Sequence, residues 1–227
     1  VDVFLVPDKG DAKAELLDLR RAILDQFGAD SAELVTVPDP KRGPDAERNA
    51  AEYATGVRDW HAARVAAFAE IIDGYDEGVI FGFLVWGDPM LYDSTLRITD
   101  ALGERLDCEV TVIPGITAIQ ALCASHEIPL NQIGASVLVT TGRRLLDEYR
   151  NHASDLVVLL DGHLQVQHLI ATDPDLMIYW GAYLGSENEV IRSGRISQVV
   201  PELLELRAGL RSEHGWVMDT YLLRRSG

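Results

Sequence analysis

The sequence predicts an α/β protein with two lobes, and three observations support this fold class. Short apolar runs, typical of buried strands, alternate with longer amphipathic runs, typical of helices, along nearly the whole chain. With 227 residues, the chain is long enough to bury one large core or two small ones. A turn and a helical segment between residues 113 and 134 separate the two halves, so we expect lobes at residues 1–112 and 113–227.

In the first lobe, the spacing of apolar residues distinguishes helices from strands. Leu16, Leu19, Ile23 and Leu24 fall on one face of a helix, whereas the run at residues 79–85 is almost continuously apolar. Prolines and a glycine at residues 38–44 mark a loop. We expect strands at residues 1–6, 34–37, 79–85 and 108–112, and helices at residues 13–27, 46–73 and 91–102.

In the second lobe, the alternation continues without an internal repeat or a low-complexity segment. A hinge helix is expected between residues 113 and 134. Further helices are expected at residues 143–151 and 164–171, with a short one near Pro201. Strands are expected at residues 135–140, 155–160, 176–180, 189–192 and 216–223.

The composition argues against several classes of protein. A formal charge of −16 disfavours a nucleic-acid partner, which needs a basic face. No apolar run reaches the roughly 18–20 residues that span a bilayer, and no signal peptide is visible, so we expect no membrane partner. Cys108 and Cys123 suit reduced core residues of a cytoplasmic protein. The six histidines show no ligand spacing, and no metal is expected.

Two turn motifs follow predicted strands and precede predicted helices. Trp86-Gly87-Asp88-Pro89-Met90-Leu91-Tyr92 closes the apolar run at residues 79–85, and Pro114-Gly115-Ile116-Thr117-Ala118 follows the strand expected at residues 108–112. Open α/β sheets bind ligands at the carboxyl ends of their strands. A Gly-Asp-Pro turn alone is a weak signal, but the ordered pair of turns is much stronger evidence for a ligand site.

With this pair of turns, the chain resembles the tetrapyrrole methylases, which use S-adenosylmethionine (SAM) to methylate porphyrin and corrin precursors. That family pairs Gly-Asp-Pro-x-x-Tyr/Phe with a downstream Pro-Gly-(Ile/Val)-(Ser/Thr)-(Ala/Ser), and both stand in this sequence. The resemblance implies two lobes, each a mixed sheet with flanking helices, a cofactor site in the cleft between them, and a homodimer.

The ends of the chain narrow the resemblance. Three segments are most similar to the members that methylate precorrin-5 at C-1 and release acetate. They are Val3-Phe4-Leu5-Val6-Pro7-Asp8-Lys9-Gly10, Ile178-Tyr179-Trp180-Gly181 and the tail from His214. Two other functions stay open. One is methylation of another precorrin, an RNA or a protein within the same fold, and the other is non-catalytic binding of a corrinoid.

The start of the chain departs from the family. These methylases normally open with a strand and a Gly-x-Gly-x-Gly loop before the segment that matches Val1. Because loss of a central strand would expose sheet edges, we expect that the sequence is a shortened version of the protein. This departure puts in doubt any site that is built in part from that loop.

The resemblance also implies which residues hold SAM. The backbone of the first turn is the family's main contact, Thr117 and Ala118 match its second contact, and Trp180 stands at its third. Structural alternatives remain, since Asp88 and Thr117 could cap helices and Trp180 could fill the core instead of stacking on adenine. The implied cofactor residues are Trp86, Gly87, Asp88, Leu91, Tyr92, Thr117, Ala118 and Trp180.

Corrin precursors carry many carboxylates, so their site needs basic side chains within an acidic protein. Arg143 and Arg144 follow a predicted strand where relatives carry a basic residue, and one of them could bind a carboxylate arm in bidentate geometry. Lys9, Arg64 and Arg97 are further candidates for substrate binding. Solvated arginines at the start of a helix are the alternative.

Acetate release implies attack of water on a carbonyl group, which needs a base for the water and a donor for the oxyanion. Tyr53, His61 and Arg64 lie on the long predicted helix, with Trp60 beside His61. We hypothesise that His61 or Asp88 is the base and that Tyr53 or Arg64 is the donor. The alternative is a solvated helix face that one aromatic ring anchors in the core.

Overall fold

The computed structural model describes residues 1–8, 14–28, 31–40 and 50–225, with the side chains of residues 14–16 and 50–54 left out. These residues form two compact units, Val1–Gly115 and Ile116–Gly227. The lobes expected from the sequence differ from these units only in the assignment of the loop at residues 113–115. Within the described ranges, no helix is long and apolar enough to cross a membrane.

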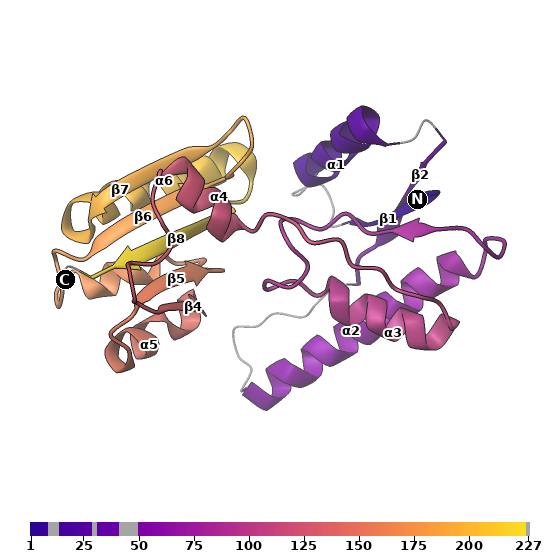
Figure 1. Ribbon diagram of the computed structural model, residues 1–227, viewed down its shortest axis with the longest axis horizontal. Helices are drawn as coiled ribbons and strands as arrows, with labels where there is room; N and C mark the ends of the chain where they lie inside the picture. The colour runs from indigo at the N-terminus through magenta and orange to yellow at the C-terminus, as the bar shows by residue number, and fades with distance from the viewer. Residues whose placement is uncertain (9–13, 29–30, 41–49, 226–227) are drawn as a thin grey trace. The chain divides into compact units, whose positions relative to one another are not determined.

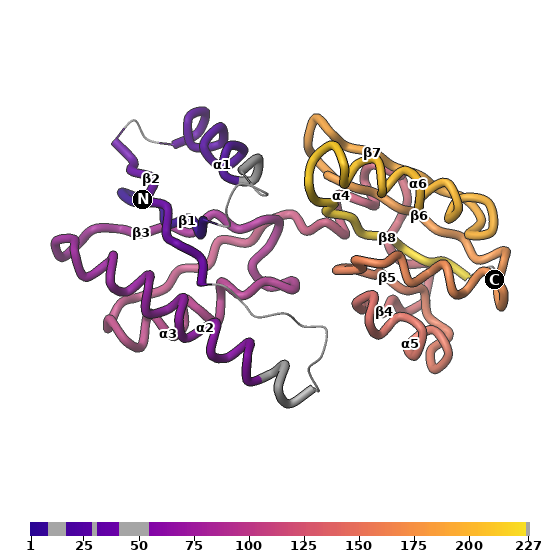
Figure 2. The backbone as a smooth tube through the Cα atoms, turned by 180° about the vertical axis from the view of Figure 1, so that it is seen from behind, coloured from indigo at the N-terminus to yellow at the C-terminus, as the bar shows by residue number. Residues whose placement is uncertain are grey.

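The first unit is built on a parallel sheet with the strand order β2-β1-β3. The helix α1 lies on one face of this sheet, and α2 and α3 lie on the other (Figures 1 and 2). The strands are β1 (Val3–Asp8), β2 (Glu33–Pro38) and β3 (Phe81–Gly82), and the helices are α1 (Ala14–Phe27), α2 (Ala50–Ile72) and α3 (Thr95–Leu106).

The core of this unit lies between the sheet and the pair α2 and α3. Val3 and Leu5 alternate along β1 and are buried on one face, as the period of a strand requires. Phe68 of α2 and Leu102 of α3 meet them in the same cluster. Phe68 also packs edge to face on Phe83, with ring centroids 5.1 Å apart.

Two of the strands expected in this half are shortened or missing. The run at residues 79–85 forms only the two-residue strand β3, and residues 108–112 form no strand. A strand needs a neighbour for its backbone hydrogen bonds, and in the described part of this unit β3 pairs with β1 alone. Cys108 and Val110 are therefore exposed, and the expectation of a core cysteine at position 108 is wrong.

The second unit holds a mixed sheet with the order β4-β5-β8-β6-β7. β4 and β5 are parallel, and β8 runs antiparallel to both β5 and β6. β4, β5 and β6 therefore point the same way, and their carboxyl ends lie at one edge of the sheet. The strands are β4 (Val137–Thr141), β5 (Asp155–Leu159), β6 (Met177–Ala182), β7 (Val190–Arg195) and β8 (Asp219–Arg224).

Helices cover both faces of this second sheet (Figure 1). Ile178 and Trp180 of β6 are buried in one core with residues of α5 and α6. Gly181 faces the other side, where a Cβ atom would lie 3.0 Å from Leu122 of α4. The helical elements are α4 (Ala118–Ser125), the 3₁₀ turn η2 (Gly142–Arg144), α5 (Leu145–Asn151), the 3₁₀ turn η3 (Gln165–Leu169) and α6 (Ile196–His214).

Two helix predictions in this half are corrected. The segment expected to be a helix at residues 164–171 is the 3₁₀ turn η3. The helix around Pro201 has 19 residues and is not short. Pro201 lies in the second turn of α6, and the buried side chains of Ile196, Val200 and Leu203 hold this helix on the sheet. Packing of an apolar face thus outweighs the hydrogen bond that proline removes.

Candidate functional site

The two turn motifs of the sequence meet in the first unit. Asp88 accepts hydrogen bonds from both, because its Oδ1 atom binds the backbone N–H of Met90 at 2.8 Å and its Oδ2 atom binds that of Gly115 at 2.8 Å. The backbones are so close that a Cβ atom on Gly115 would lie 2.1 Å from the carbonyl oxygen of Gly87. Gly87 itself has a φ of +72°, which glycine adopts without strain.

This arrangement decides the chemistry of Asp88. The N–H of Gly115, and then that of Met90, stabilise the carboxylate and hold the pKa of Asp88 below its ordinary value. A carboxylate with a lowered pKa accepts protons poorly, which argues against Asp88 as the base. The alternative that Asp88 is the N-cap of a helix from Met90 onward is also wrong, because the next helix, α3, begins only at Thr95. The backbone N–H of Thr95 bonds to the carboxylate of Asp93 instead. Asp88 instead joins the two turns and keeps a negative charge beside them.

The residues that follow Asp88 are presented outward. Met90 is 69% exposed and Tyr92 is 47% exposed, which is high for side chains of this kind. Tyr92 also has a φ of +50°, a left-handed conformation that a tyrosine seldom adopts. Residues held in such conformations cluster at ligand sites. The turn therefore offers an exposed backbone, two exposed apolar side chains and a fixed anion.

A residue that the sequence analysis missed supports this turn from another helix. The Nε atom of Arg20 on α1 donates to the carbonyl oxygen of Leu84 at 3.2 Å, and its guanidinium lies 4.8 Å from the centroid of the Trp86 ring. Burial lowers the pKa of Arg20, and the charge of Asp93 opposes that effect. No sequence signal marks Arg20, because a basic residue on an amphipathic helix is ordinary. The indole N–H of Trp86 is buried and has no hydrogen-bond partner among the described residues.

Thr117 is the N-cap of α4, which is one of the two roles expected for this residue. Its hydroxyl accepts the backbone N–H of Gln120, and the Gln120 side chain accepts the backbone N–H of Thr117 at 2.7 Å, which is a complete capping box. Ala118 is the first residue of the helix. The capping box fixes the start of α4 three residues after Gly115.

Trp180 lies in the core of the second unit. Its side chain is fully buried, and its indole N–H donates to the Oδ2 atom of Asp219 at 2.7 Å. A ring that packs on all sides offers no face to an adenine, so the structure corrects the expectation of a stacking contact in favour of the core alternative. The carbonyl oxygen of Trp180 is 3.0 Å from the Nε2 atom of His126.

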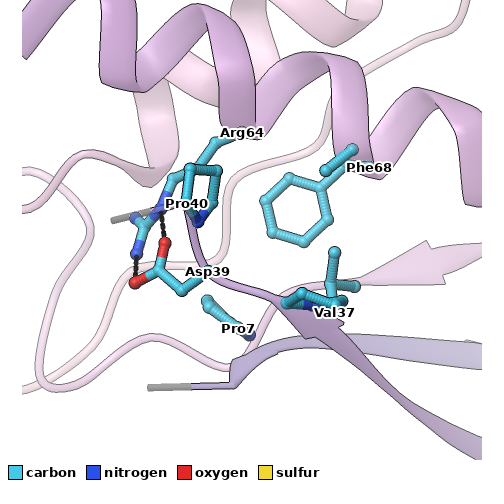
Figure 3. Close-up of a pocket in the computed structure, with 8 residues that line it drawn as sticks. Pro7, Val37, Asp39, Pro40, Arg64 and Phe68 are labelled. Carbon is cyan, nitrogen blue, oxygen red and sulfur yellow. Dashed lines mark hydrogen bonds and ion pairs between the residues drawn. The ribbon is translucent and has the colours of Figure 1, made fainter. Parts of the chain in front are cut away.

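Arg64 is occupied by an acidic partner from the loop after β2. Its Nε and one terminal nitrogen form a bidentate ion pair with Asp39 at 2.6 and 2.7 Å (Figure 3). Its guanidinium also lies 3.8 Å from the centroid of the Trp60 ring, and Trp60 donates to the carbonyl oxygen of Pro40 at 2.9 Å. The hollow that Arg64 lines has no room even for a water molecule. Arg64 therefore fastens the loop, and its expected roles as substrate binder and oxyanion donor stay predictions.

Among the candidates on α2, His61 points to the segment that follows the first turn. Its Nε2 atom lies 2.9 Å from the hydroxyl oxygen of Ser94, the residue before α3. Ser94 makes no capping bond with its side chain. The side chain of Tyr53 and the whole of Lys9 lie outside the described residues, so these two candidates stay predictions.

The arginines after β4 differ in their surroundings. Both side chains are exposed. Arg144 forms an ion pair with Glu148 one turn later on α5, with nitrogen to oxygen distances of 2.8 and 2.5 Å, and this pair lowers the pKa of Glu148. Arg143 stands directly at the carboxyl edge of the sheet. Arg97 is exposed on α3 and donates to the backbone oxygen of Asp93 at 3.2 Å.

A comparison with known proteins identifies the family. The family model of the Tetrapyrrole (Corrin/Porphyrin) Methylases matches residues 1–200. The chain belongs to the tetrapyrrole methylases. A precorrin-6A synthase (deacetylating) from Sinorhizobium sp is a curated relative in this family, and it is 43% identical over 232 residues that cover 99% of this chain and 85% of the relative.

Solved structures agree with this assignment to the tetrapyrrole methylases. The cobalamin synthesis related protein (CobF) from Corynebacterium diphtheriae has 38% sequence identity and a TM-score of 0.77, over 99% of this chain and 87% of that chain. A uroporphyrin-III C-methyl transferase from Thermus thermophilus, complexed with S-adenosyl homocysteine, has 16% identity and a TM-score of 0.53, over 98% of this chain and 97% of that chain. At that identity the second likeness shows the fold alone. The predicted α/β fold class and the predicted family are thus confirmed.

Proposed function

We propose that this tetrapyrrole methylase transfers a methyl group from SAM to C-1 of precorrin-5 and releases acetate, which gives precorrin-6A. The proposal is supported by the 43% identity to a precorrin-6A synthase (deacetylating) over 99% of the chain. The observation that carries it is that the carboxylate of Asp88 accepts hydrogen bonds from both family turns, at the backbone N–H groups of Met90 and Gly115.

The residues at these turns suit SAM. When bound, SAM supplies an activated methyl group on a positively charged sulfur, so the protein has mainly to bind it, orient it and exclude water. Gly87 lets the backbone approach a ligand closely, and the lowered pKa of Asp88 keeps a negative charge beside it at neutral pH. Met90 and Tyr92 offer exposed apolar surface for an adenosine group. We include Trp86 and Leu91 as residues of the same turn, and Thr117 and Ala118 as cofactor residues on the family resemblance alone.

For acetate release, we propose His61 as the base. Asp88 is a poor proton acceptor and Arg64 is held by Asp39, whereas a histidine side chain is the group that most often serves as a general base. The hydroxyl of Ser94 lies within hydrogen-bond reach of the His61 ring and orients it. Tyr53 remains the proposed donor to the oxyanion, and Arg143 the proposed partner of a carboxylate arm.

Anaerobic incubation with SAM and precorrin-5 tests the function directly. Mass spectrometry should detect the methylated corrin, acetate and S-adenosylhomocysteine in equal amounts. Saturable SAM binding without methylation of precorrin-5 would contradict the substrate and leave another target for the methyl group. Absence of SAM binding would contradict the methyltransferase and favour a corrinoid-binding protein.

The same assay tests His61. In His61→Ala, acetate release should fall by about a hundredfold or more, because a positioned base contributes about 10²–10⁴-fold, while SAM binding stays unchanged. His168→Ala is the matched control, since His168 is an exposed histidine on η3 of the second unit. Unchanged acetate release in His61→Ala would remove His61 from the mechanism.

We further propose that the protein works in the cytoplasm as a homodimer. The family resemblance supports the dimer. The two free thiols, Cys108 and Cys123, are those of a reducing compartment. Sedimentation equilibrium would measure the mass in solution, and a monomer at micromolar concentration would contradict the dimer.

A further inference from the structure

The first helix of the second unit depends on other elements for its position. α4 has eight residues, whereas an isolated helix shorter than about 12–15 residues is only marginally stable in water. Its first turn is closed by the capping box of Thr117 and Gln120, which is a contact within the helix itself. Leu122 packs over Gly181 of β6 and is fully buried. Because apolar packing is not directional, the polar contacts at the far end of α4 fix where the helix lies along the sheet.

Two side chains make these polar contacts. His126 is the C-cap residue of α4, and its Nε2 atom donates to the carbonyl oxygen of Trp180 on β6 at 3.0 Å. One terminal nitrogen of Arg224 on β8 donates to the carbonyl oxygens of Pro129 and Leu130, both at 2.9 Å. The end of α4 and the loop after it are thus bonded to two neighbouring strands of the sheet.

Arg224 is itself held in one orientation. Its Nε atom forms an ion pair with Asp155 of β5 at 2.9 Å, and the two side chains are only 14% and 5% exposed. A guanidinium presents its donors in a rigid planar fork, so the pair with Asp155 directs a terminal nitrogen at Pro129 and Leu130. Burial raises the pKa of the Cys123 thiol on α4, and the charge of Arg224 opposes that effect. The cation therefore lies close enough to act on the helix itself.

The next residue, Arg225, makes the corresponding contacts on the other face of the sheet. Successive side chains along a strand point to opposite faces, and Arg225 donates to the carbonyl oxygens of Tyr149 and His152 at 2.6 and 2.8 Å, at the end of α5. Its guanidinium lies 4.0 Å from the centroid of the Tyr149 ring. The end of the central strand β8 thus carries two arginines, one that anchors the loop after α4 and one that anchors α5.

We propose that Arg224 is a positioning residue for methyl transfer, which holds α4 on the sheet so that Thr117 and Ala118 stand where the cofactor binds. This inference rests on the proposed function, which assigns these two residues to SAM. A short helix moves as a rigid body, so a displacement at the last turn of α4 reaches the first turn, about 12 Å away. Arg224 exerts its effect through the helix, whereas Arg225 anchors a helix that carries no residue assigned to the cofactor.

Arg224→Lys tests the inference, with Arg225→Lys as its matched control. Lysine keeps a positive charge beside the buried Asp155, so the fold is retained, but one ammonium group does not reproduce the fork that reaches two carbonyl oxygens. Each variant loses such a pair of bonds, so both should unfold at a similarly lowered urea concentration. Only Arg224→Lys should raise the SAM dissociation constant, by about tenfold, the factor that corresponds to one or two hydrogen bonds.

Hydrogen exchange at the backbone amides of α4 keeps this test separate from that of the proposed function. Exchange there should quicken by about tenfold in Arg224→Lys and stay unchanged in Arg225→Lys. If the unaltered protein binds SAM, the dissociation constants decide, and equal values in the two variants would overturn the inference. If it binds none, the proposed function has failed, and faster exchange at α4 in Arg224→Lys alone would still support Arg224 as the residue that positions α4. Equal exchange at α4 in both variants would overturn that role.

Discussion

Replacing Gly115 with alanine should separate the two turns that Asp88 joins. The new Cβ atom would lie 2.1 Å from the carbonyl oxygen of Gly87, whereas Cβ atoms essentially never approach another atom within 3.0 Å. The obstacle is backbone, which cannot rotate away as a side chain can. The two turns must therefore move apart by nearly an ångström.

That movement removes the bond between the turns. The Gly115 N–H now lies 2.8 Å from the Oδ2 atom of Asp88, and a shift of this size takes it beyond the roughly 3.2 Å limit of a good N–H···O bond. Misplacement of a binding group by 1 Å can cost about 10²-fold in rate. We therefore expect kcat/KM for methyl transfer to fall about a hundredfold in Gly115→Ala, with a matching loss of SAM affinity.

Isothermal titration with SAM and the methyl-transfer assay measure the two effects. Gly209→Ala is the control, because Gly209 is an exposed residue of α6 and a Cβ atom there meets nothing within 4 Å. Alanine should stabilise that helix by roughly 0.5–1 kcal/mol and leave SAM binding unchanged. Ordinary SAM affinity in Gly115→Ala would refute the view that contact between the two turns builds the cofactor site.

Two other predictions follow from buried and charged groups. The folded-state pKa of Asp88 lies below the ordinary 3.8, so the carboxylate is charged at neutral pH and keeps its bond to Gly115. Both the charge and the bond are lost only as the pH falls through that lowered pKa. SAM affinity, measured by titration, should therefore not change through Asp88 from about pH 8 to about pH 5, and Asp88→Asn should weaken it throughout. Trp180→Phe removes the hydrogen bond to Asp219 and should lower the free energy of unfolding in urea by about 1–3 kcal/mol, with SAM affinity unchanged. A large loss of SAM affinity would instead indicate that the ring contacts the cofactor.

Most helices and strands could be predicted because their signals are local. The apolar spacing in residues 13–27 and the continuous apolar run at residues 156–160 each depend only on neighbouring side chains. The strand expected at residues 108–112 failed because a strand also needs a partner, which its own residues cannot supply. The length of α6 was underestimated because Pro201 is a local signal that packing overrides.

The amino-acid sequence by itself determined the pair of turns, the family, and the residue types available for cofactor and substrate. It could do so because a Gly-Asp-Pro turn and a Pro-Gly turn are each contained in a few consecutive residues. The tertiary structure alone decided what those residues do. Asp88 bonds to Gly115, Arg64 to Asp39 and Trp180 to Asp219, and the members of each pair are separated by 27, 25 and 39 positions.

The same physical reason explains a residue that the sequence did not reveal. Arg20 belongs to a helix of ordinary local composition, and its significance comes from its neighbours on another segment, the carbonyl oxygen of Leu84 and the ring of Trp86. Hydrogen bonds and burial depend on which atoms the fold brings within about 3 Å of each other, and that proximity exists only once the sheet has formed.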